Sequence, residues 1–226
     1  DSTRVNININ TRDKWSISAT GRVRVKKEQR ISAQVYDANI FGTGDRLGVT
    51  TNLKRKDNVY GGNSVEYSSP NILGTFYTLN FAAGKDFESS TLRASLNKDF
   101  ISPTDYKIGV SYMKDRNELY ELLQADTLRY TMIGQHNFDV WSGKSIYIKP
   151  IKYSIYFTGH YNQVRFFDRP HVGPKLNMGF HNHKDALMAV GLYREKFYSA
   201  TMIYGFGFEE YIAAGYRAEI VGGYEW

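Results

Sequence analysis

The 226-residue sequence predicts an all-β protein, an antiparallel transmembrane β-barrel or a large part of one, with about twelve strands. Three observations support this fold class. Apolar and polar side chains alternate along many segments, the apolar positions of those segments carry no charge, and two segments are as long as a membrane-spanning strand. A spanning strand needs about 9–11 residues, whereas a strand of a soluble protein usually has about five or six.

The two longest alternating segments are residues 15–26 and 151–162. Strand side chains point alternately to the two faces of a sheet, so each segment has one apolar and one polar face. An Arg or Lys that faces lipid at the bilayer centre costs about 2–4 kcal/mol, so uncharged faces of this length favour contact with lipid. A soluble sheet that covers a dry core alternates too, and it stays the weaker alternative. The apolar positions are Trp15, Ile17, Ala19, Gly21, Val23, Val25, Ile151, Tyr153, Ile155, Phe157, Gly159 and Tyr161.

Shorter segments repeat the alternation and polar turns separate them. We expect strands in residues 5–10, 77–84, 92–97, 106–113, 198–206 and 216–226, with turns at 11–14, 56–58, 85–88 and 102–105. Residues 114–127 and 167–184 are longer and irregular, which predicts external loops, the first with a possible helical turn at 118–124. No domain boundary is visible. Residues 1–226 are therefore expected to be a single outer-membrane barrel domain or a fragment of one.

Composition agrees with a barrel and argues against other classes. The 18 Tyr and 13 Phe suit aromatic girdles, and the low mean hydropathy of -0.48 fits a protein in which only alternate residues face lipid. There is no run of about twenty apolar residues, as a transmembrane helix would need. The net charge of +6 is spread over strands and turns, including Lys54-Arg55-Lys56, so nucleic-acid binding is not predicted.

The two ends of the sequence and its lack of cysteine add little. No Cys is present, which excludes disulfides and thiol chemistry. The first residues do not form a signal peptide, and we interpret the numbering as beginning at a mature or truncated start. The last three residues, Tyr224-Glu225-Trp226, have the aromatic character of a barrel's end and could equally lie in mid-barrel.

No catalytic motif is present, so the sequence predicts no enzyme and no catalytic, cofactor-binding or metal-binding residues. There is neither a Gly-x-Ser-x-Gly elbow nor a phosphate-binding loop. His181-Asn182-His183, with His171 nearby, lacks a Cys or carboxylate partner at zinc spacing, which favours surface histidines. Three further sets are interpreted as structural: Ser154 with His160, the Glu209-Glu210 pair, and the Asp168-Arg169 pair.

Two phrases carry a resemblance to a known family. Residues 39–47 read Asn-Ile-Phe-Gly-Thr-Gly-Asp-Arg-Leu, and residues 69–75 read Ser-Pro-Asn-Ile-Leu-Gly-Thr after Glu66-Tyr67-Ser68. Both resemble the opening hairpins of the BamA, TamA and FhaC superfamily, whose members assemble or translocate proteins at the outer membrane. Residues 139–144, 165–170 and 204–210, followed by Gly215, are similar to later segments of this family in Bacteroidota-like envelopes.

The resemblance implies a protein insertase or translocase in the outer membrane of a Gram-negative-type cell, with no cofactor. Its partners would be outer-membrane lipid, unfolded client proteins and accessory envelope proteins. The first-strand edge, in residues 5–10 or 15–25, would pair weakly with the last strand, open laterally and template an incoming strand. The family's Arg-Gly-Phe motif and periplasmic modules are missing, so the match covers the first part of the family's barrel. The alternatives are a passive channel or structural barrel and, more weakly, a soluble β-rich binding protein.

Overall fold

The computed structural model describes residues 15–25, 29–40, 42–55, 59–87, 89–101, 105–123, 127–149, 153–169, 180–201 and 209–226. Within these ranges the chain forms eleven strands and one short 3₁₀ helix, η1 (Ile72–Gly74). No helix in the same ranges has the length and apolar character needed to cross a membrane. The strands are β1 (Ile17–Val25), β2 (Gln29–Ile40), β3 (Asp45–Arg55), β4 (Val59–Ser69), β5 (Thr78–Lys85), β6 (Ser89–Lys98), β7 (Tyr106–Leu123), β8 (Thr127–Ile148), β9 (Tyr153–Asp168), β10 (His183–Thr201) and β11 (Glu209–Glu225).

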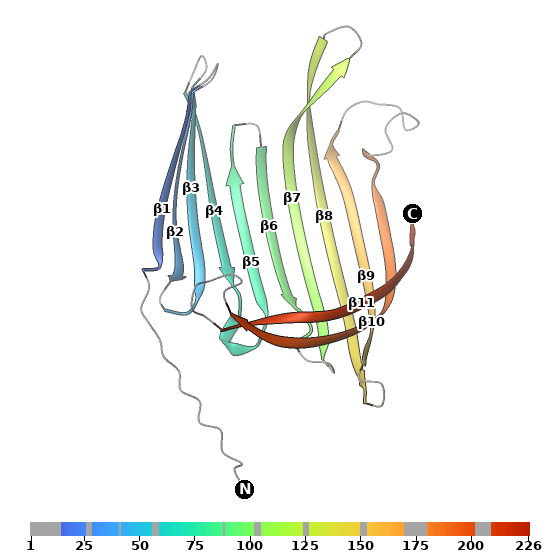
Figure 1. The fold of residues 1–226 in the computed structure, drawn as a ribbon. Coiled ribbons are helices and arrows are strands. Elements are labelled where there is room, and N and C mark those ends of the chain that lie inside the picture. Colours follow the sequence, from blue (N-terminus) through green and yellow to red (C-terminus); the bar gives the residue numbers. More distant parts are fainter. Residues whose placement is uncertain are drawn as a thin grey trace.

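All eleven strands belong to one sheet and follow one another in sequence order (Figure 1). Every neighbouring pair is antiparallel. The all-β, antiparallel part of the sequence prediction is therefore confirmed. The count is eleven in the described ranges, against the expected dozen. One expected strand, in residues 5–10, lies outside the described residues, as does the turn expected at 11–14.

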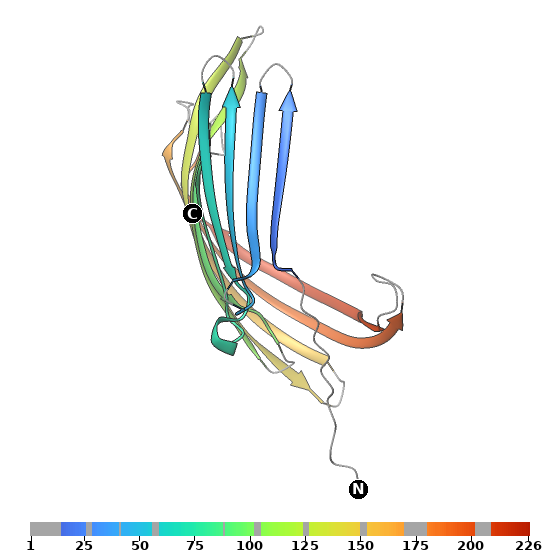
Figure 2. The ribbon, with the colours of Figure 1, turned by 90° about the vertical axis from the view of Figure 1, so that its left-hand side faces the viewer.

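The sheet is a single curved layer. Its concave side faces the viewer in Figure 1, where β10 and β11 swing across the lower part of that side, and Figure 2 shows the same bend from the flank. Successive connections alternate between the two ends of the strands, as a meander of antiparallel strands requires. The result is a trough with a convex outer face and a concave inner face.

The first and last strands of this sheet have the same sense in the meander. Strand sense reverses at each step, so the first and the eleventh strand start from the same end of the sheet. The curvature of the sheet sets β11 at a large angle to β1 (Figure 1). Bacterial single-chain barrels are closed by antiparallel pairs and have even strand numbers. In the described residues β1 and β11 each pair on one side only. One further strand between them would be antiparallel to both.

One sequence prediction was wrong. Residues 114–123 were expected to be an external loop with a helical turn at 118–124, but β7 continues through Leu123 and pairs with β8 from Thr127 onward. Charges such as Lys114 and Arg116 interrupt the apolar alternation here, and that interruption suggested a loop. Strand pairing needs only backbone hydrogen bonds, so a hairpin can extend beyond its apolar band.

The other expected connections lie between strands. Lys85 ends β5, and Asp86 and Phe87 lead toward β6, so the expected turn at 85–88 is confirmed over its described part. Residues 56–58 and 102–104 separate β3 from β4 and β6 from β7 but lie outside the described residues, as do 170–179 between β9 and β10. The long segment at 167–184 therefore does include a strand-to-strand connection.

Candidate functional site

The two faces of the sheet differ sharply in chemistry. Strand register fixes which side chains share a face, and one row of directly paired residues on the convex face is apolar across β1 to β6. The row then reaches Lys114 on β7 and His136 on β8, so it becomes polar on these two strands. Its apolar members are Ala19, Val35, Val49, Val65, Ala83 and Leu92.

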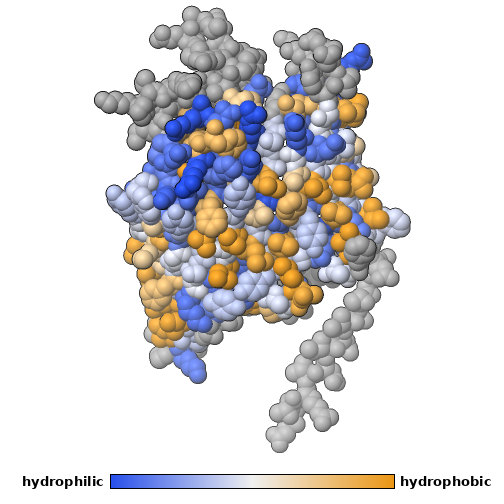
Figure 3. Space-filling view, turned by 180° about the vertical axis from the view of Figure 1, so that it is seen from behind, coloured by the Kyte–Doolittle hydropathy of each residue, from blue (hydrophilic) through white to orange (hydrophobic). Residues whose placement is uncertain are grey.

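The apolar side chains of the convex face are exposed. Val23, Met188 and Ile220 have exposed fractions of 69%, 78% and 82%. Figure 3, which views the molecule from behind, shows hydrophobic residues spread across the middle and lower part of this face, with hydrophilic residues above them toward one side. Monomeric soluble proteins rarely expose apolar patches of more than a few hundred Å². Further exposed residues on this face are Ile17, Val25, Ile31, Val35, Val49, Leu53, Phe81, Leu92, Leu96, Ile108, Val110, Phe138, Val140, Ile146, Phe157, Val190, Tyr216 and Tyr224.

Buried side chains lie mainly on the opposite, concave face, and most of them are polar. Tyr156, Ser145 and Ser154 have exposed fractions of 1%, 0% and 3%, and Asp115 has 6%. Among the described residues only Tyr156 and Ala189 are buried hydrophobic residues. Most of the buried side chains in the described residues are thus polar, while the convex face carries many exposed apolar ones.

A groove with both polar and apolar walls runs along the concave face over β2 to β7. Its volume is about 610 Å³. On its floor Ser68 Oγ donates to Asn80 Oδ1 at 2.8 Å, and Asn80 Nδ2 donates to Ser95 Oγ at 3.3 Å, which links β4, β5 and β6. Leu47, Gly48, Tyr67, Phe81, Ala82, Ala94 and Tyr112 also line it, together with a set that is mostly polar or charged: Gln34, Tyr36, Arg46, Glu66, Ser68, Asn80, Arg93, Ser95, Ser111 and Met113.

A buried tyrosine ties the last three strands together on the concave face. Tyr156 of β9 donates its hydroxyl hydrogen to Glu219 of β11 and accepts from Arg217 Nε at 2.7 Å. Arg217 Nη2 lies 2.9 Å from Glu219 Oε2, and its guanidinium lies 4.9 Å from the centre of the Tyr156 ring. To reach β11, the Tyr156 ring passes over Gly191 of β10, its direct cross-strand partner. A Cβ atom at Gly191 would overlap this ring.

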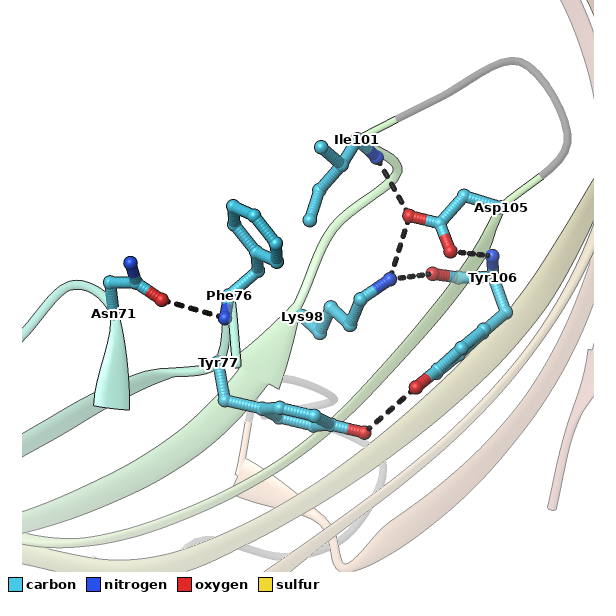
Figure 4. A network of polar contacts seen from close by, with 7 residues as sticks. All are labelled: Asn71, Phe76, Tyr77, Lys98, Ile101, Asp105 and Tyr106. Atoms are coloured by element: carbon cyan, nitrogen blue, oxygen red, sulfur yellow. Dashed lines mark hydrogen bonds and ion pairs between the residues drawn. The ribbon is translucent and has the colours of Figure 1, made fainter. Parts of the chain in front are cut away.

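An aromatic and charged cluster marks one end of β6 and β7 (Figure 4). Lys98 Nζ lies 2.7 Å from Asp105 Oδ2, donates to the Tyr106 carbonyl at 3.1 Å, and lies 4.0 Å from the centre of the Tyr106 ring. The Tyr106 and Tyr77 hydroxyls are 3.5 Å apart. The hydrogen bond from Lys98 lowers the pKa of Asp105 to about 2, with help from the backbone N–H groups of Tyr106 and Ile101. We call Tyr77, Lys98, Asp105 and Tyr106 the rim cluster.

The two phrases that carry the family resemblance both form turns at one end of the sheet. In the first, Gly42 and Gly44 have positive φ angles of 74° and 81°, and the Asn39 side-chain oxygen accepts from Gly44 N–H at 2.6 Å. Glycine is the residue that adopts such angles without strain. In the second, Asn71 Oδ1 accepts from Phe76 N–H at 2.7 Å. The turns expected from these phrases are therefore present.

The edges of β1 and β11 offer backbone groups for pairing. The Ala38 N–H donates to the Ser16 carbonyl at 2.9 Å, so the even-numbered residues of β1 bond to β2 and the odd-numbered ones point to the open side. Lys184 and Trp226 exchange two bonds of 3.0 Å, so in β11 the odd-numbered residues point away from β10. Each edge thus presents an alternating set of N–H and C=O groups.

The histidines form separate pairs with carboxylates. His181 Nε2 lies 2.9 Å from Glu225 Oε1, and His183 Nε2 lies 3.6 Å from Asp185 Oδ2. The His181 and His183 rings do lie close, with centroids 5.1 Å apart. Among the described residues, however, no group of three or more His, Cys, Asp or Glu is arranged to hold a metal. His171 lies outside the described residues.

The remaining candidates are not brought together as a catalytic site. Ser154 and His160 share the concave face of β9, but six residues at about 3.3 Å each separate them by roughly 20 Å. His160 contacts Asp139 of β8 instead. Asp168 accepts from Arg116 Nη2 at 2.9 Å and Nε at 3.1 Å rather than pairing with Arg169. Glu209 and Glu210 begin β11, and their side chains lie outside the described ones.

Comparisons with protein-family profiles, curated proteins and solved structures found no match. The superfamily resemblance therefore depends on the short sequence phrases alone, namely the two turn phrases and the three later segments. Sequence analysis missed the Tyr156, Arg217 and Glu219 network, in which Tyr156 lies more than sixty residues from the other two members. Two features could have revealed it: a large aromatic residue among the small polar residues of its face, and opposite charges two residues apart on one strand.

Proposed function

We propose that the chain forms the wall of an outer-membrane β-barrel in a Gram-negative-type cell, and that this barrel inserts or translocates proteins by strand templating at its edge. One observation carries the membrane part of the proposal. Exposed apolar side chains lie on the convex face of every strand except β4, while most of the buried polar side chains in the described residues lie on the concave face. Acyl chains are the surroundings that match such a face, because each uncharged side chain would then leave water.

The outer edges of β1 and β11 support the proposal that the barrel acts by strand templating. An unpaired strand edge is a template for another strand, and strand addition obtains its affinity from main-chain hydrogen bonds. Because β1 and β11 have the same sense in the meander, a client strand of the opposite sense has the direction that antiparallel pairing with either edge needs. The turn phrases that resemble the insertase superfamily point to the same activity.

Adjacent residues on β7 test the membrane part. Val110 faces outward and is 39% exposed, whereas Ser111 faces the concave groove. Val110→Arg should lower the free energy of unfolding from liposomes by about 2–4 kcal/mol, which destabilises the inserted protein. Ser111→Arg should lower it much less, because the groove has room for the side chain. Urea titration of the protein in phosphatidylcholine liposomes measures both. A larger cost for Ser111→Arg would reject the assignment of the two faces.

A proline at the edge tests the templating part. Ala19 is odd-numbered, so its N–H points to the open side of β1, and Ala19→Pro removes this donor without removing a bond to β2. Ala19→Ile is the matched control, because it changes the side chain and keeps the donor. With the full-length protein in liposomes, Ala19→Pro should slow the folding of an added outer-membrane protein, and Ala19→Ile should not. Wild-type insertion rates for a well-folded Ala19→Pro variant would reject templating at β1.

The alternative function is a passive channel or structural barrel, and the charged and polar side chains in the concave groove, such as Arg46, Glu66 and Arg93, are the observation that favours it. The same liposomes decide between the two functions. A steady solute conductance that is unaffected by Ala19→Pro, without any effect on client folding, would favour the channel.

A further inference from the structure

The outward-facing side chains of β7 to β10 change in character along the strands. Toward the rim cluster they are apolar, and Val110 and Val190 are exposed there. Toward the opposite end they become aromatic and then basic, and Figure 3 shows hydrophilic residues above the hydrophobic ones on one side of this face. Four basic residues share the convex face at this end, and we call them the basic band: Lys114 and Arg116 of β7, Arg165 of β9 and Lys184 of β10.

Aromatic side chains lie between the apolar residues and the basic band. The Tyr112 hydroxyl of β7 is 2.7 Å from Nδ1 of His136 on β8. The Trp226 ring of β11 stacks with the Tyr224 ring, and its centre is 6.4 Å from that of Tyr161 on β9. Tyr and Trp gather where a membrane meets water, and barrels carry girdles of such residues. The order apolar, aromatic, basic is the order of a strand that leaves the hydrocarbon and enters the headgroup layer.

Three cations of the basic band form no ion pair with the described residues: Lys114, Arg165 and Lys184. Lys114 lies over the Phe167 ring, with Nζ 5.4 Å from the ring centre. A neutral ring leaves the charge of the ammonium group uncompensated. Arg165 and Lys184 both have the neutral Gln163 as a neighbour on the same face, the first along β9 and the second across to β10.

Two carboxylates share this part of the convex face with the basic band. Asp168 bonds to Arg116, so this pair is neutral. Glu118, the next outward-facing residue of β7, is engaged in a contact of its own. Asp185 and Glu225 belong to β10 and β11 but lie on the concave face. Four cations against two carboxylates leave an excess of two positive charges.

The cations of the basic band are spread over several strands. From Lys114 on β7 to Lys184 on β10 there are three steps between neighbouring strands. At about 4.8 Å a step, the two backbones are roughly 14 Å apart. A headgroup with one phosphate would contact one end of the band at a time, whereas a headgroup with two separated phosphates can contact both ends together.

We propose that the basic band binds one lipid whose headgroup carries two phosphate groups, while its acyl chains cover the apolar part of the convex face. One phosphate lies beside Lys114, and the other lies beside Arg165 and Lys184. The inference rests on the membrane part of the proposed function, because only a lipid-facing surface meets such a ligand. It also places this end of the strands in the leaflet that contains the lipid.

Native mass spectrometry of the full-length protein tests the site, after release from phosphatidylcholine nanodiscs that contain bisphosphorylated and monophosphorylated lipid A in equal amounts. The wild-type protein should retain the bisphosphorylated form in about fivefold preference, the attraction expected from one further basic residue near an anionic surface. Lys114→Gln combined with Arg165→Gln should lower retention of this form roughly 25-fold and abolish the preference. Lys184→Gln alone should lower it about fivefold, and it serves if the double variant does not fold.

Arg194→Gln is the matched control. Arg194 also faces outward from β10, and its guanidinium lies 5.6 Å from the centre of the Tyr153 ring, but it lies at the opposite end of the strands. This variant should bind both lipids as the wild-type protein does. Equal retention of the two lipids by the wild-type protein would overturn the proposal, as would wild-type retention in the variants of the basic band or an equal loss in Arg194→Gln. Failure of the wild-type protein to enter nanodiscs would instead overturn the proposed function.

Discussion

Gly191→Ala should destabilise the protein through a clash with Tyr156. The ring of Tyr156 lies directly over Gly191, is 1% exposed, and is held by Arg217 Nε at 2.7 Å and by Glu219. Forcing a methyl group into a filled site costs about 1–3 kcal/mol. If the ring moves aside instead, its hydrogen bonds to charged groups are lost, which costs about 1.5–3 kcal/mol. By either route the free energy of unfolding should fall by about 2 kcal/mol.

Urea unfolding in detergent micelles, followed by tryptophan fluorescence, measures this change. Gly222→Ala on the adjacent strand is the control, because nothing lies within 4 Å of its Cβ position, and it should stay within about 0.5 kcal/mol of wild type. In a Tyr156→Ala background the Gly191→Ala substitution should become nearly neutral, since the overlapping ring is gone. Equal effects of Gly191→Ala and Gly222→Ala would refute the reasoning.

Two further predictions concern one end of the sheet. The pKa of Asp105 is lowered from 3.8 to about 2, so its link to Lys98 stabilises the fold fully above pH 3.8 and is lost as pH falls through about 2. NMR titration of the Asp105 carboxyl should give a midpoint near 2 that returns toward 3.8 in Lys98→Met; an unchanged midpoint in that variant would contradict the pairing. In the β2–β3 turn, Asn39→Ala removes the acceptor for Gly44 N–H and should lower unfolding free energy by about 1 kcal/mol in the same urea assay, whereas a neutral result would show that water replaces the bond.

The alternation of apolar and polar side chains predicted the sheet because it is a local property of the chain. Each strand carries its apolar face in its own sequence, so residues 15–26 and 151–162 could be recognised without knowledge of their neighbours. Alternation failed to predict the second half of β7, because the charged residues Lys114 and Arg116 interrupt the apolar pattern while the strand continues. Arg116 bonds to Asp168 of β9, a contact that only the register of three strands brings together.

The internal network could not be predicted for the same reason. Tyr156 reaches Glu219 only because Gly191 lies opposite it and leaves room for the ring, and that coincidence depends on the register of β9, β10 and β11. Ser142 and Gly159 likewise become neighbours only through the pairing of β8 with β9. Features that depend on register were thus the ones that sequence analysis missed.

The edge of β1 also determines what an incoming strand would have to be. The odd-numbered residues of β1, such as Ala19 and Val23, point their backbone N–H groups to the open side of the strand. The side chains of the same residues lie on the convex face. A strand that bonds to them places the side chains of its bonded partners on the same convex face. A slip of one residue would turn the apolar face of that strand away from lipid. The edge would therefore supply hydrogen bonds to any strand, while the surrounding lipid would select those whose apolar residues fall opposite Ala19 and Val23.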